Sequence, residues 1–282
     1  MKKIDFLKVI NEKCPEIKVE SFSINIMGEN NIVCIVNGDM IFRFPKDDFS
    51  TEKFMTEINN LKAVSSVNTL QVPNLIGYEI EPTPFMYYEM IIGEVLSKEV
   101  FEALENKERI VVQLRNFLEE IHSVEKDKIV FKTVYNKEYW INVYERVQRE
   151  IFDLLDLSVQ NEVVKLFDDF LQGYDEDIID SKVIHGDMVS ANVIYQEDKL
   201  IGIVDFAEMS FGDPAIDIGM LCSKYGYGEK FLEILIEKYD IYKEMKDRIV
   251  FYSKAFIFCE ILEFYQKYNI FVFHDCLKNI ML

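Results

Sequence analysis

The sequence lacks long apolar runs and has few cysteines, and each shortage excludes a class of protein. No stretch approaches the ~18 apolar residues that a membrane-spanning helix needs. The N-terminus begins like a signal peptide, but Asp5 and Glu12 interrupt any apolar segment. The cysteines are odd in number, scattered and without metal-ligand spacing: Cys14, Cys34, Cys222, Cys259 and Cys276. We therefore expect a soluble, cytoplasmic protein with buried thiols.

Basic residues are also scarce, with 31 Lys and Arg against 50 Asp and Glu, for a formal charge of −19. Such a surface repels nucleic acids and anionic membranes and attracts cations. Ordinary solubility explains the charge equally well, so it supports a cationic small-molecule substrate without establishing one. With 282 residues, 49% of them hydrophobic, the chain can form one large domain or two modest ones, and we expect a monomer.

Three short β-branched runs separated by polar loops stand out in the second half of the chain. They span residues 182–184, 193–195 and 200–204, and each is too short for a helix. Asp187 and Asn192 lie in the loop after the first run, and Asp205 directly follows the last. The pattern therefore places acid and amide side chains beside strand ends.

These side chains suit phosphoryl transfer, which requires a carboxylate for the acceptor's proton and oxygen ligands for Mg²⁺. Asp187 suits the first task, and Asn192 and Asp205 suit the second. The pattern His185-x-Asp187-x-x-x-x-Asn192, followed by Asp205-Phe206, matches the catalytic and metal loops of the kinase fold. Simple turn formation is the alternative, but it does not account for His185 and Asp205 as well.

The first part of the chain favours a small sheet with one main helix. Strands are predicted at 21–27, 31–36, 39–44, 72–80 and 84–92, and helices at 4–13 and 51–65. Asn37-Gly38 predicts a type I′ hairpin turn. The turn at Gly28 lies over the nucleotide phosphates in a kinase-like lobe, although a plain polar turn explains it equally well.

A cation on the third predicted strand is a candidate phosphate ligand. Alternation puts Arg43 on the face opposite Phe42 and Phe44. Glu57 lies beside the apolar stripe of the predicted helix, from which it could pair with Arg43. The alternative is a surface Arg and a solvated Glu.

Helices dominate after Gly93. They are predicted at 97–104, 108–124, 136–157, 159–173, 215–224, 230–239, 242–267 and 275–281. His122 has helical spacing with its apolar neighbours, which favours a packing or capping role. Tyr135, Tyr139 and Trp140 are more typical of a core than of a ligand site, although an aromatic face can bind cations.

The motifs at 185–192, 203–206 and 212–217 resemble the aminoglycoside phosphotransferase family, and residues 42–46 and 88–93 look most like its 2″-phosphotransferase branch. The resemblance implies an α+β, two-lobed protein-kinase-like fold. An antiparallel-sheet lobe with one main helix would comprise residues 1–92 and bind the nucleotide. A larger, mostly helical lobe with short catalytic β-hairpins would comprise residues 93–282 and bind the acceptor.

The resemblance also implies roles for individual residues. Asp187 would be the catalytic base, with Ser190 able to reach a phosphate oxygen, and Asn192 and Asp205 would hold Mg²⁺. His185 and Asp217 would support the catalytic loop. The nucleotide site would comprise Gly28, Arg43 in place of the usual Lys, its partner Glu57, the hinge residues Glu89 and Ile91, and Tyr88, a bulky residue that goes with a preference for GTP over ATP.

The acceptor is predicted to be a small molecule. Asp213 follows Asp205 by eight positions, which leaves no room for the activation loop that docks a peptide in protein kinases. Glu260 and Glu263, one turn apart, and Glu233 are candidate ligands for ammonium groups, and a solvated helix face is the alternative. The expected reaction is transfer from GTP or ATP to an aminoglycoside hydroxyl, the 2″-OH. The alternatives are a metabolic kinase for choline, a sugar or an amino alcohol, and a non-catalytic binding module, which the complete set of catalytic residues disfavours.

Overall fold

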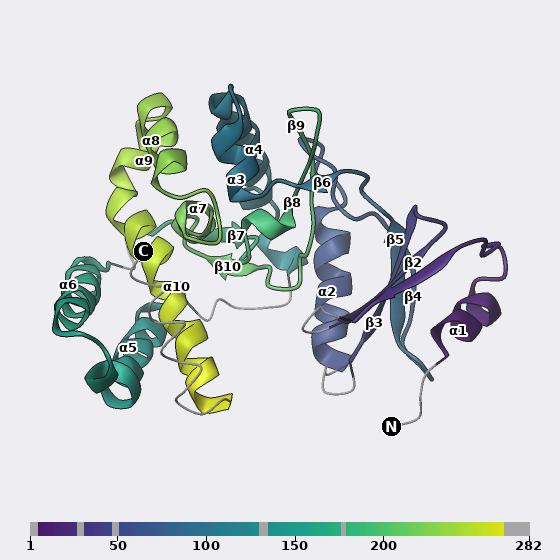
Figure 1. Cartoon of the computed structure of the whole chain (residues 1–282), viewed down its shortest axis with the longest axis horizontal. Helices are drawn as coiled ribbons and strands as arrows, with labels where there is room; N and C mark the ends of the chain where they lie inside the picture. The colour runs from purple at the N-terminus through teal and green to yellow at the C-terminus, as the bar shows by residue number, and fades with distance from the viewer. Residues whose placement is uncertain (1–4, 27–30, 47–50, 130–134, 176–178, 268–282) are drawn as a thin grey trace.

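The computed structural model describes residues 5–26, 31–46, 51–129, 135–175 and 179–267 and has two lobes (Figure 1). One lobe is an antiparallel sheet with a helix packed against it, and the other is mostly helical with short strands at the junction. This architecture confirms the predicted α+β, two-lobed fold, while the boundary between residues 92 and 93 stays a prediction. Within the described ranges, no helix is long and apolar enough to cross a membrane.

The first lobe contains a five-stranded antiparallel sheet with the order β1-β2-β3-β5-β4. Asn37 and Gly38 have φ values of 56° and 80° and form the β2–β3 turn that the Asn-Gly pair predicts. The five predicted strands are confirmed, although three are shorter than expected. Their bounds are β1 Phe22–Asn25, β2 Asn31–Val36, β3 Met40–Pro45, β4 Leu75–Glu79 and β5 Phe85–Glu89.

Strand β3 separates two apolar layers. Phe42 and Phe44 are buried on the side of α1 (Phe6–Lys13), where the ring centroids of Phe44 and Phe6 lie 4.8 Å apart. Arg43 faces α2 (Thr51–Val64), as strand alternation predicts. The predicted apolar stripe of α2 is buried: Phe54, Ile58, Leu61 and Val64.

The second lobe is organised around a short helix that is buried along its whole length, α7. Helix α10 packs closely on it, because a Cβ at Gly219 would lie 2.6 Å from Cβ of Tyr252. The helices of this lobe are α3 Lys98–Ala103, α4 Lys107–His122, α5 Lys137–Arg146, α6 Leu157–Gly173, α7 Ala215–Cys222, α8 Glu229–Lys238, α9 Ile241–Glu244 and α10 Lys246–Lys267.

The predicted single helix over 136–157 is wrong. Helix α5 ends at Arg146, a π-helical turn spans Val147–Ile151, and a 3-10 turn spans Phe152–Leu154. Val147 and Ile151 stay buried at helical spacing across the break, so periodicity alone did not reveal it. The Gln160 side-chain N–H groups donate to the carbonyls of Phe152 and Leu155, both at 3.0 Å, and stabilise the non-helical end.

The helices predicted nearest the C-terminus differ from the described structure or lie outside it. The expected helix over 242–267 begins at Lys246 and is preceded by the separate α9. The expected helix over 275–281 lies outside the described residues.

The three β-branched runs form strands at the junction of the lobes. Hairpin β8 (Val193–Gln196) to β9 (Lys199–Ile203) also pairs with β6 (Glu94–Val95), whereas β7 (Lys182–Ile184) pairs with β10 (Ser210–Gly212). The three predicted strands are confirmed. The sequence reading missed β6 and β10, which are too short to give a periodic signal.

The segment between α2 and β4 fastens the two lobes together. Gln71 donates its N–H to the carbonyl of Ile201 and accepts the N–H of Ile203, both at 2.9 Å. On α4, the Glu120 carboxylate accepts the backbone N–H groups of Asn68 and Thr69 at 2.9 and 2.8 Å. These contacts fix the first lobe on the second beside the loops that carry the polar motifs.

Candidate active site

The backbone of the loop between β7 and β8 is hydrogen-bonded to one buried carboxylate, that of Asp217. Asp217 accepts the backbone N–H of His185 at 3.0 Å and that of Gly186 at 2.9 Å. Gly186 has φ = +81°, and a Cβ there would lie 2.2 Å from the carbonyl oxygen of Glu208. The loop therefore turns sharply before Asp187, as glycine alone permits.

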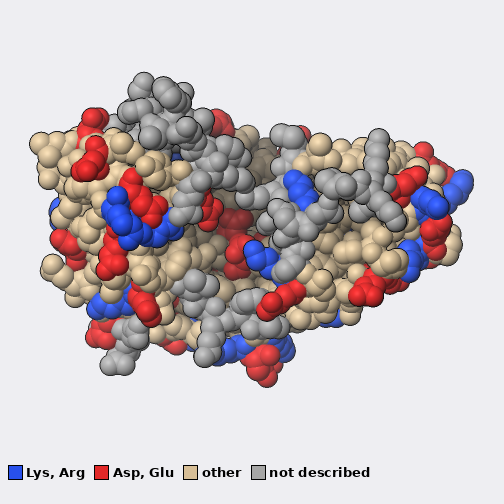
Figure 2. All heavy atoms as spheres, turned by 90° about the horizontal axis from the view of Figure 1, so that it is seen from below, with Lys and Arg blue, Asp and Glu red and all other residues tan. Residues whose placement is uncertain are grey.

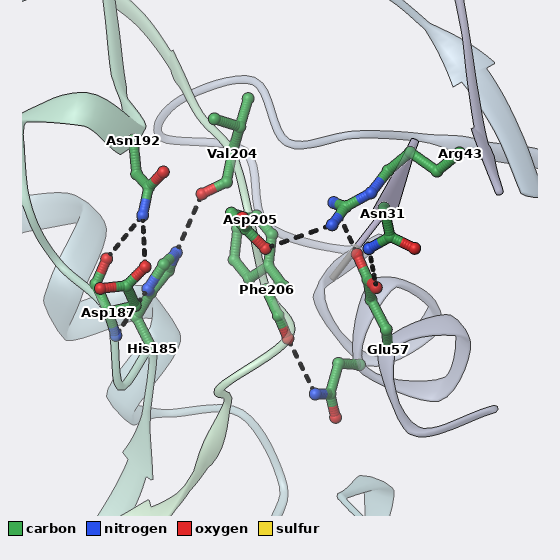
Figure 3. A network of polar contacts seen from close by, with 10 residues as sticks. Asn31, Arg43, Glu57, His185, Asp187, Asn192, Val204, Asp205 and Phe206 are labelled. Atoms are coloured by element: carbon green, nitrogen blue, oxygen red, sulfur yellow. Dashed lines mark hydrogen bonds and ion pairs between the residues drawn. The ribbon is translucent and has the colours of Figure 1, made fainter. Parts of the chain in front are cut away.

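His185 joins the two loops that the sequence pattern brings together. Its Nδ1 lies 3.2 Å from the backbone N–H of Asp187, and its Nε2 lies 3.3 Å from the carbonyl of Val204 (Figure 3). Nδ1 can accept only if it carries no proton, so these partners favour the Nε2–H tautomer. The backbone N–H of Val204 also donates to the carbonyl of Asn192 at 3.0 Å.

Asp187 and Asn192 are in direct contact. The Asn192 amide nitrogen donates to Oδ2 of Asp187 at 2.8 Å and to its carbonyl at 2.9 Å, so the amide oxygen points away from Asp187 (Figure 3). Burial, with smaller effects of Asp205 and Asp217, raises the pKa of Asp187, although His185 and Asn192 oppose the shift. A carboxyl with a raised pKa is a better proton acceptor at neutral pH.

Asp205 lies between this loop and the first lobe. Its φ is +66°, which is uncommon for a residue other than glycine. The next residue is fixed, because Asn60 of α2 donates to the carbonyl of Phe206 at 2.8 Å. The Asp205 carboxylate is 42% exposed and its Oδ1 is 3.6 Å from Nη2 of Arg43. The backbone strain therefore turns an accessible carboxylate toward the space between the lobes.

Magnesium fits the donors present on the two loops. Mg²⁺ prefers oxygen ligands and retains waters, so the Asn192 amide oxygen and the Asp205 carboxylate are suitable ligands. Because the amide nitrogen of Asn192 is engaged by Asp187, its oxygen remains the group that can coordinate. Among the residues the structure describes, no group of three or more His, Cys, Asp or Glu side chains could hold a metal ion.

In the first lobe, Arg43 and Glu57 form the predicted pair. Nη1 of Arg43 is 2.6 Å from Oε1 of Glu57, and Asn31 donates to Glu57 at 3.5 Å (Figure 3). Burial raises the pKa of Glu57, and Arg43 only partly opposes that rise. Tyr88 is buried on β5 and hydrogen-bonds Arg43. The alternative of a surface Arg with a solvated Glu is wrong.

Two of the remaining nucleotide-site candidates lie at and just after the end of strand β5. Glu89 is exposed and pairs with Met40, whereas Ile91 packs over Gly202, where a Cβ would lie 2.9 Å from Ile91 Cδ1. Gly28 lies outside the described residues. The assignment of these residues to the nucleotide stays a prediction.

A cavity of about 1410 Å³ opens beside Asp187 and extends between α6, α8 and α10. Near Asp187 its wall includes Glu208, Tyr135 and Tyr225, and farther away it includes Glu233. Figure 2, which views the molecule from below relative to Figure 1, shows Asp and Glu side chains in a hollow at the centre of that face, next to a basic side chain.

The predicted acceptor ligands are distributed unevenly around this cavity. Glu233 lines it and pairs with Lys230 at 2.9 Å. Glu260 and Glu263 are exposed on α10 and are not part of the described wall. Glu260 nevertheless accepts a hydrogen bond from the hydroxyl of Tyr225, a wall residue.

Ser190 is held by the same tyrosine. Its backbone N–H and its Oγ both donate to the carbonyl of Tyr225, at 2.9 and 2.8 Å. The hydroxyl is thus engaged with the protein, and its predicted contact with a phosphate requires that this bond open. Its role stays a prediction.

Sequence reasoning missed four residues of the site. Glu208 faces Asp187, Asn60 holds Phe206, Tyr225 holds Ser190, and His122 contacts Asp217. Only Glu208 carried a local signal, because it follows Asp205 by three positions in the same loop. The other three come from distant segments and join the site only through the tertiary fold.

The chain belongs to the phosphotransferase enzyme family, whose model matches residues 28–248. It is therefore a phosphotransferase, and the predicted family resemblance and enzyme class are confirmed. A comparison with curated protein sequences found no match.

Solved structures share the fold across nearly the whole chain. The GDP complex of wild-type aminoglycoside 2′-phosphotransferase-IIIa has a TM-score of 0.87 and 21% identity, covering 99% of this chain and 98% of that chain. The gentamicin–APH(2″)-IIa complex has a TM-score of 0.73 and 19% identity, covering 100% of this chain and 97% of that chain. Macrolide 2′-phosphotransferase type I has a TM-score of 0.71 and 16% identity, covering 99% of this chain and 98% of that chain. At these identities the likeness establishes the fold.

Proposed function

We propose that the protein transfers the γ-phosphoryl group of GTP or ATP to a hydroxyl of an aminoglycoside antibiotic, the 2″-OH, and thereby confers resistance. The site residues have the roles that the resemblance implies. Asp187 is the base, Asn192 and Asp205 hold Mg²⁺, and Arg43, positioned by Glu57, binds the phosphates. The setting is cytoplasmic, in agreement with the free thiols of Cys14, Cys34, Cys222 and Cys259.

The protein groups divide the chemistry between them. Oδ2 of Asp187 accepts the Asn192 amide, which leaves Oδ1 to accept the proton of the attacking hydroxyl. Bound Mg²⁺ supplies charge neutralisation on the phosphate oxygens. Nη2 of Arg43 lies 3.6 Å from Oδ1 of Asp205. The guanidinium group would therefore offer a second positive charge beside the metal site, where negative charge develops on the phosphate oxygens during transfer.

The observation that carries the acceptor proposal is the excess of negative charge at the catalytic end of the cavity. Burial raises the pKa of Glu208, and the charges of Asp187, Asp205 and Glu263 raise it further, opposed by Lys53. Carboxylates that repel one another in this way are stabilised by an ammonium group placed among them. Aminoglycosides carry several ammonium groups, so a polycation suits this end of the cavity.

The aromatic wall supports the same acceptor. Tyr135 lines the cavity near Asp187 and Glu208, with its ring edge-on to Phe256 at a centroid distance of 5.2 Å. An aromatic face beside carboxylates favours a cation that also has apolar ring surface. Trp140, in contrast, is fully buried in the core.

The runner-up is a metabolic kinase for choline, a sugar or an amino alcohol. One observation favours the uncharged member of this group, a sugar: the cavity wall also has lysines, among them Lys165, Lys243 and Lys246, so it is not uniformly acidic. The volume of about 1410 Å³ exceeds the roughly 300–1,000 Å³ of ordinary ligand pockets. A large acceptor therefore accounts for the cavity better than a small one does.

Nucleotide consumption by the purified protein separates these candidates. The protein is incubated with GTP or ATP, Mg²⁺ and one acceptor at a time: kanamycin, gentamicin, a macrolide, choline or a sugar. We expect stimulation by the two aminoglycosides and a product heavier by one phosphoryl group. Stimulation by choline or a sugar alone would overturn the aminoglycoside proposal while retaining the kinase chemistry.

A further inference from the structure

The end of helix α4 contacts the buried carboxylate beneath the catalytic loop. Nε2 of His122 lies 2.9 Å from Oδ2 of Asp217, although the two residues are 95 positions apart. Asp217 is fully buried, whereas the His122 side chain is 14% exposed. His122 therefore connects the loop support to a more accessible part of the molecule.

This contact is not a helix cap. The end of α4 is already satisfied, because the N–H of Ser123 bonds to the carbonyls of Glu120 and Ile121, and its Oγ donates to that of Glu119. His122 instead donates across the lobe to α7. The contact therefore does not support a capping role for His122, whereas a packing role agrees with its 14% exposed side chain.

His122 affects both the charge and the orientation of Asp217. Burial by itself would raise the pKa of Asp217, but the hydrogen bond and charge of His122, together with His185 and the Gly186 N–H, hold it below its ordinary value. Among the described residues, His122 is the one side chain that hydrogen-bonds this carboxylate. Without His122, the buried anion loses its only described side-chain donor and is held by the two backbone N–H groups alone.

We propose that His122 is a positioning residue for phosphoryl transfer. It fixes the Asp217 carboxylate, Asp217 fixes the N–H groups of His185 and Gly186, and Gly186 directs Asp187 into the cavity. The inference rests on the proposed role of Asp187 as base. Both neutral and protonated imidazole donate from Nε2, so the contact does not depend on a single protonation state.

A second cavity makes the proposal testable by chemical rescue. It has a volume of about 730 Å³ and shares no lining residue with the cavity beside Asp187. Its wall includes His122, Lys182, Phe211 and Tyr242. Removal of the imidazole ring of His122 would leave a space open to this cavity. Free imidazole can enter such a space and donate to Asp217 in place of the side chain.

The experiment compares three variants of His122 in the full chain. His122→Leu removes the donor, His122→Gln retains an N–H of similar reach, and His122→Ala opens the space for imidazole. We expect His122→Leu to lower kcat by on the order of 10- to 100-fold with the nucleotide KM unchanged. We expect glutamine to restore most of the loss, and added imidazole to rescue His122→Ala in a saturable manner.

Hydrogen exchange gives a readout independent of activity. Asp217 protects the amides of His185 and Gly186, so peptides covering 183–188 should exchange faster in His122→Leu. The matched control is Tyr227→Phe, which removes a buried hydrogen bond to the Leu96 carbonyl in the same lobe. This variant should retain kcat and the exchange rate of 183–188, and imidazole should not affect it.

The possible failures are distinguishable. If Asp187→Ala retains turnover, the base assignment fails and the proposed function fails with it. If Asp187→Ala abolishes turnover but His122→Leu retains kcat within about twofold and exchange at 183–188 is unchanged, the positioning role alone is overturned. A glutamine variant as impaired as the leucine variant, without imidazole rescue, would also overturn it.

Discussion

Two fully buried carboxylates, one in each lobe, have opposite environments. Asp217 accepts hydrogen bonds from two backbone N–H groups and His122, and its pKa is lowered. Glu57 has Arg43 at 2.6 Å and one long bond from Asn31, and its pKa is raised by burial. Each carboxylate is removed from water, but only Asp217 receives full compensation within the protein.

The difference shows which part of the site is complete before the substrates bind. Around Glu57, the side-chain atoms Arg43 Nε and Asn31 Oδ1 are buried without a hydrogen-bond partner among the described residues. Burying a polar group without a partner is unfavourable. The network around Asp217 in the helical lobe is therefore preformed, whereas the network around Glu57 in the sheet lobe is incomplete.

The largest expected effect is on kcat and comes from substitution of Asp187, which lies in the wall of the cavity. Asp187→Ala should lower kcat by about 10²–10⁴-fold, because it removes the acceptor of the hydroxyl proton, while the nucleotide Kd stays the same. Single-turnover kinetics and calorimetric nucleotide titration measure the two quantities. Asp153→Ala, on an exposed turn, is the control, and unchanged turnover in Asp187→Ala would contradict the assignment.

The next prediction compares the two carboxylates directly. Asp217→Ala should lower the free energy of unfolding by about 3–5 kcal/mol, because it leaves buried donors without their acceptor. Glu57→Gln should leave it nearly unchanged at neutral pH, because burial already disfavours the ionised form of Glu57. It should raise the nucleotide KM on the order of tenfold, because Arg43 loses its ionic partner. Urea unfolding and steady-state kinetics test both, and equal losses of stability would remove the contrast.

The stability of the fold should depend on pH in opposite ways through the two carboxylates. Because the pKa of Asp217 is lowered on folding, its ionisation stabilises the fold above the ordinary carboxyl value of about 4. That contribution disappears as the pH falls through the lowered value. The stability advantage of the wild type over Asp217→Asn should therefore shrink below about pH 4. The raised pKa of Glu57 predicts the opposite sign for Glu57→Gln, and urea titrations between neutral and acid pH distinguish the two.

The smallest expected effect concerns nucleotide choice. Tyr88 is buried behind Arg43 on β5, where its bulk is proposed to favour GTP. We expect kcat/KM to be higher for GTP than for ATP, and Tyr88→Ala to change the ratio on the order of tenfold toward ATP. Ile76→Ala, an exposed position on the edge strand β4, is the control. A wild-type preference for ATP would end this proposal.

The parts of the molecule that the sequence predicts correctly depend on local patterns. The spacing of Asp187, Asn192 and Asp205 gives the two loops, Asn37-Gly38 gives a hairpin, and strand alternation gives the direction of Arg43. In each case, the neighbours along the chain fix the geometry.

The missed features depend on contacts between distant segments. His122 meets Asp217, Glu120 meets Thr69, and Gln160 terminates the helical region near Leu155 from outside it. No local pattern distinguishes these side chains from solvated or packed ones. The large cavity beside Asp187 lies between three helices that are separate in sequence, so the exposed positions of Glu260 and Glu263 could not be predicted from the sequence either.

A crystal structure with GTP or a GTP analogue and Mg²⁺ tests the central claim most directly. We predict that the Asn192 amide oxygen and the Asp205 carboxylate coordinate one ion on the nucleotide phosphates. Arg43 should contact the same phosphates, and Asp187 should face the cavity. An ion bound away from both Asn192 and Asp205 would contradict the proposed mechanism.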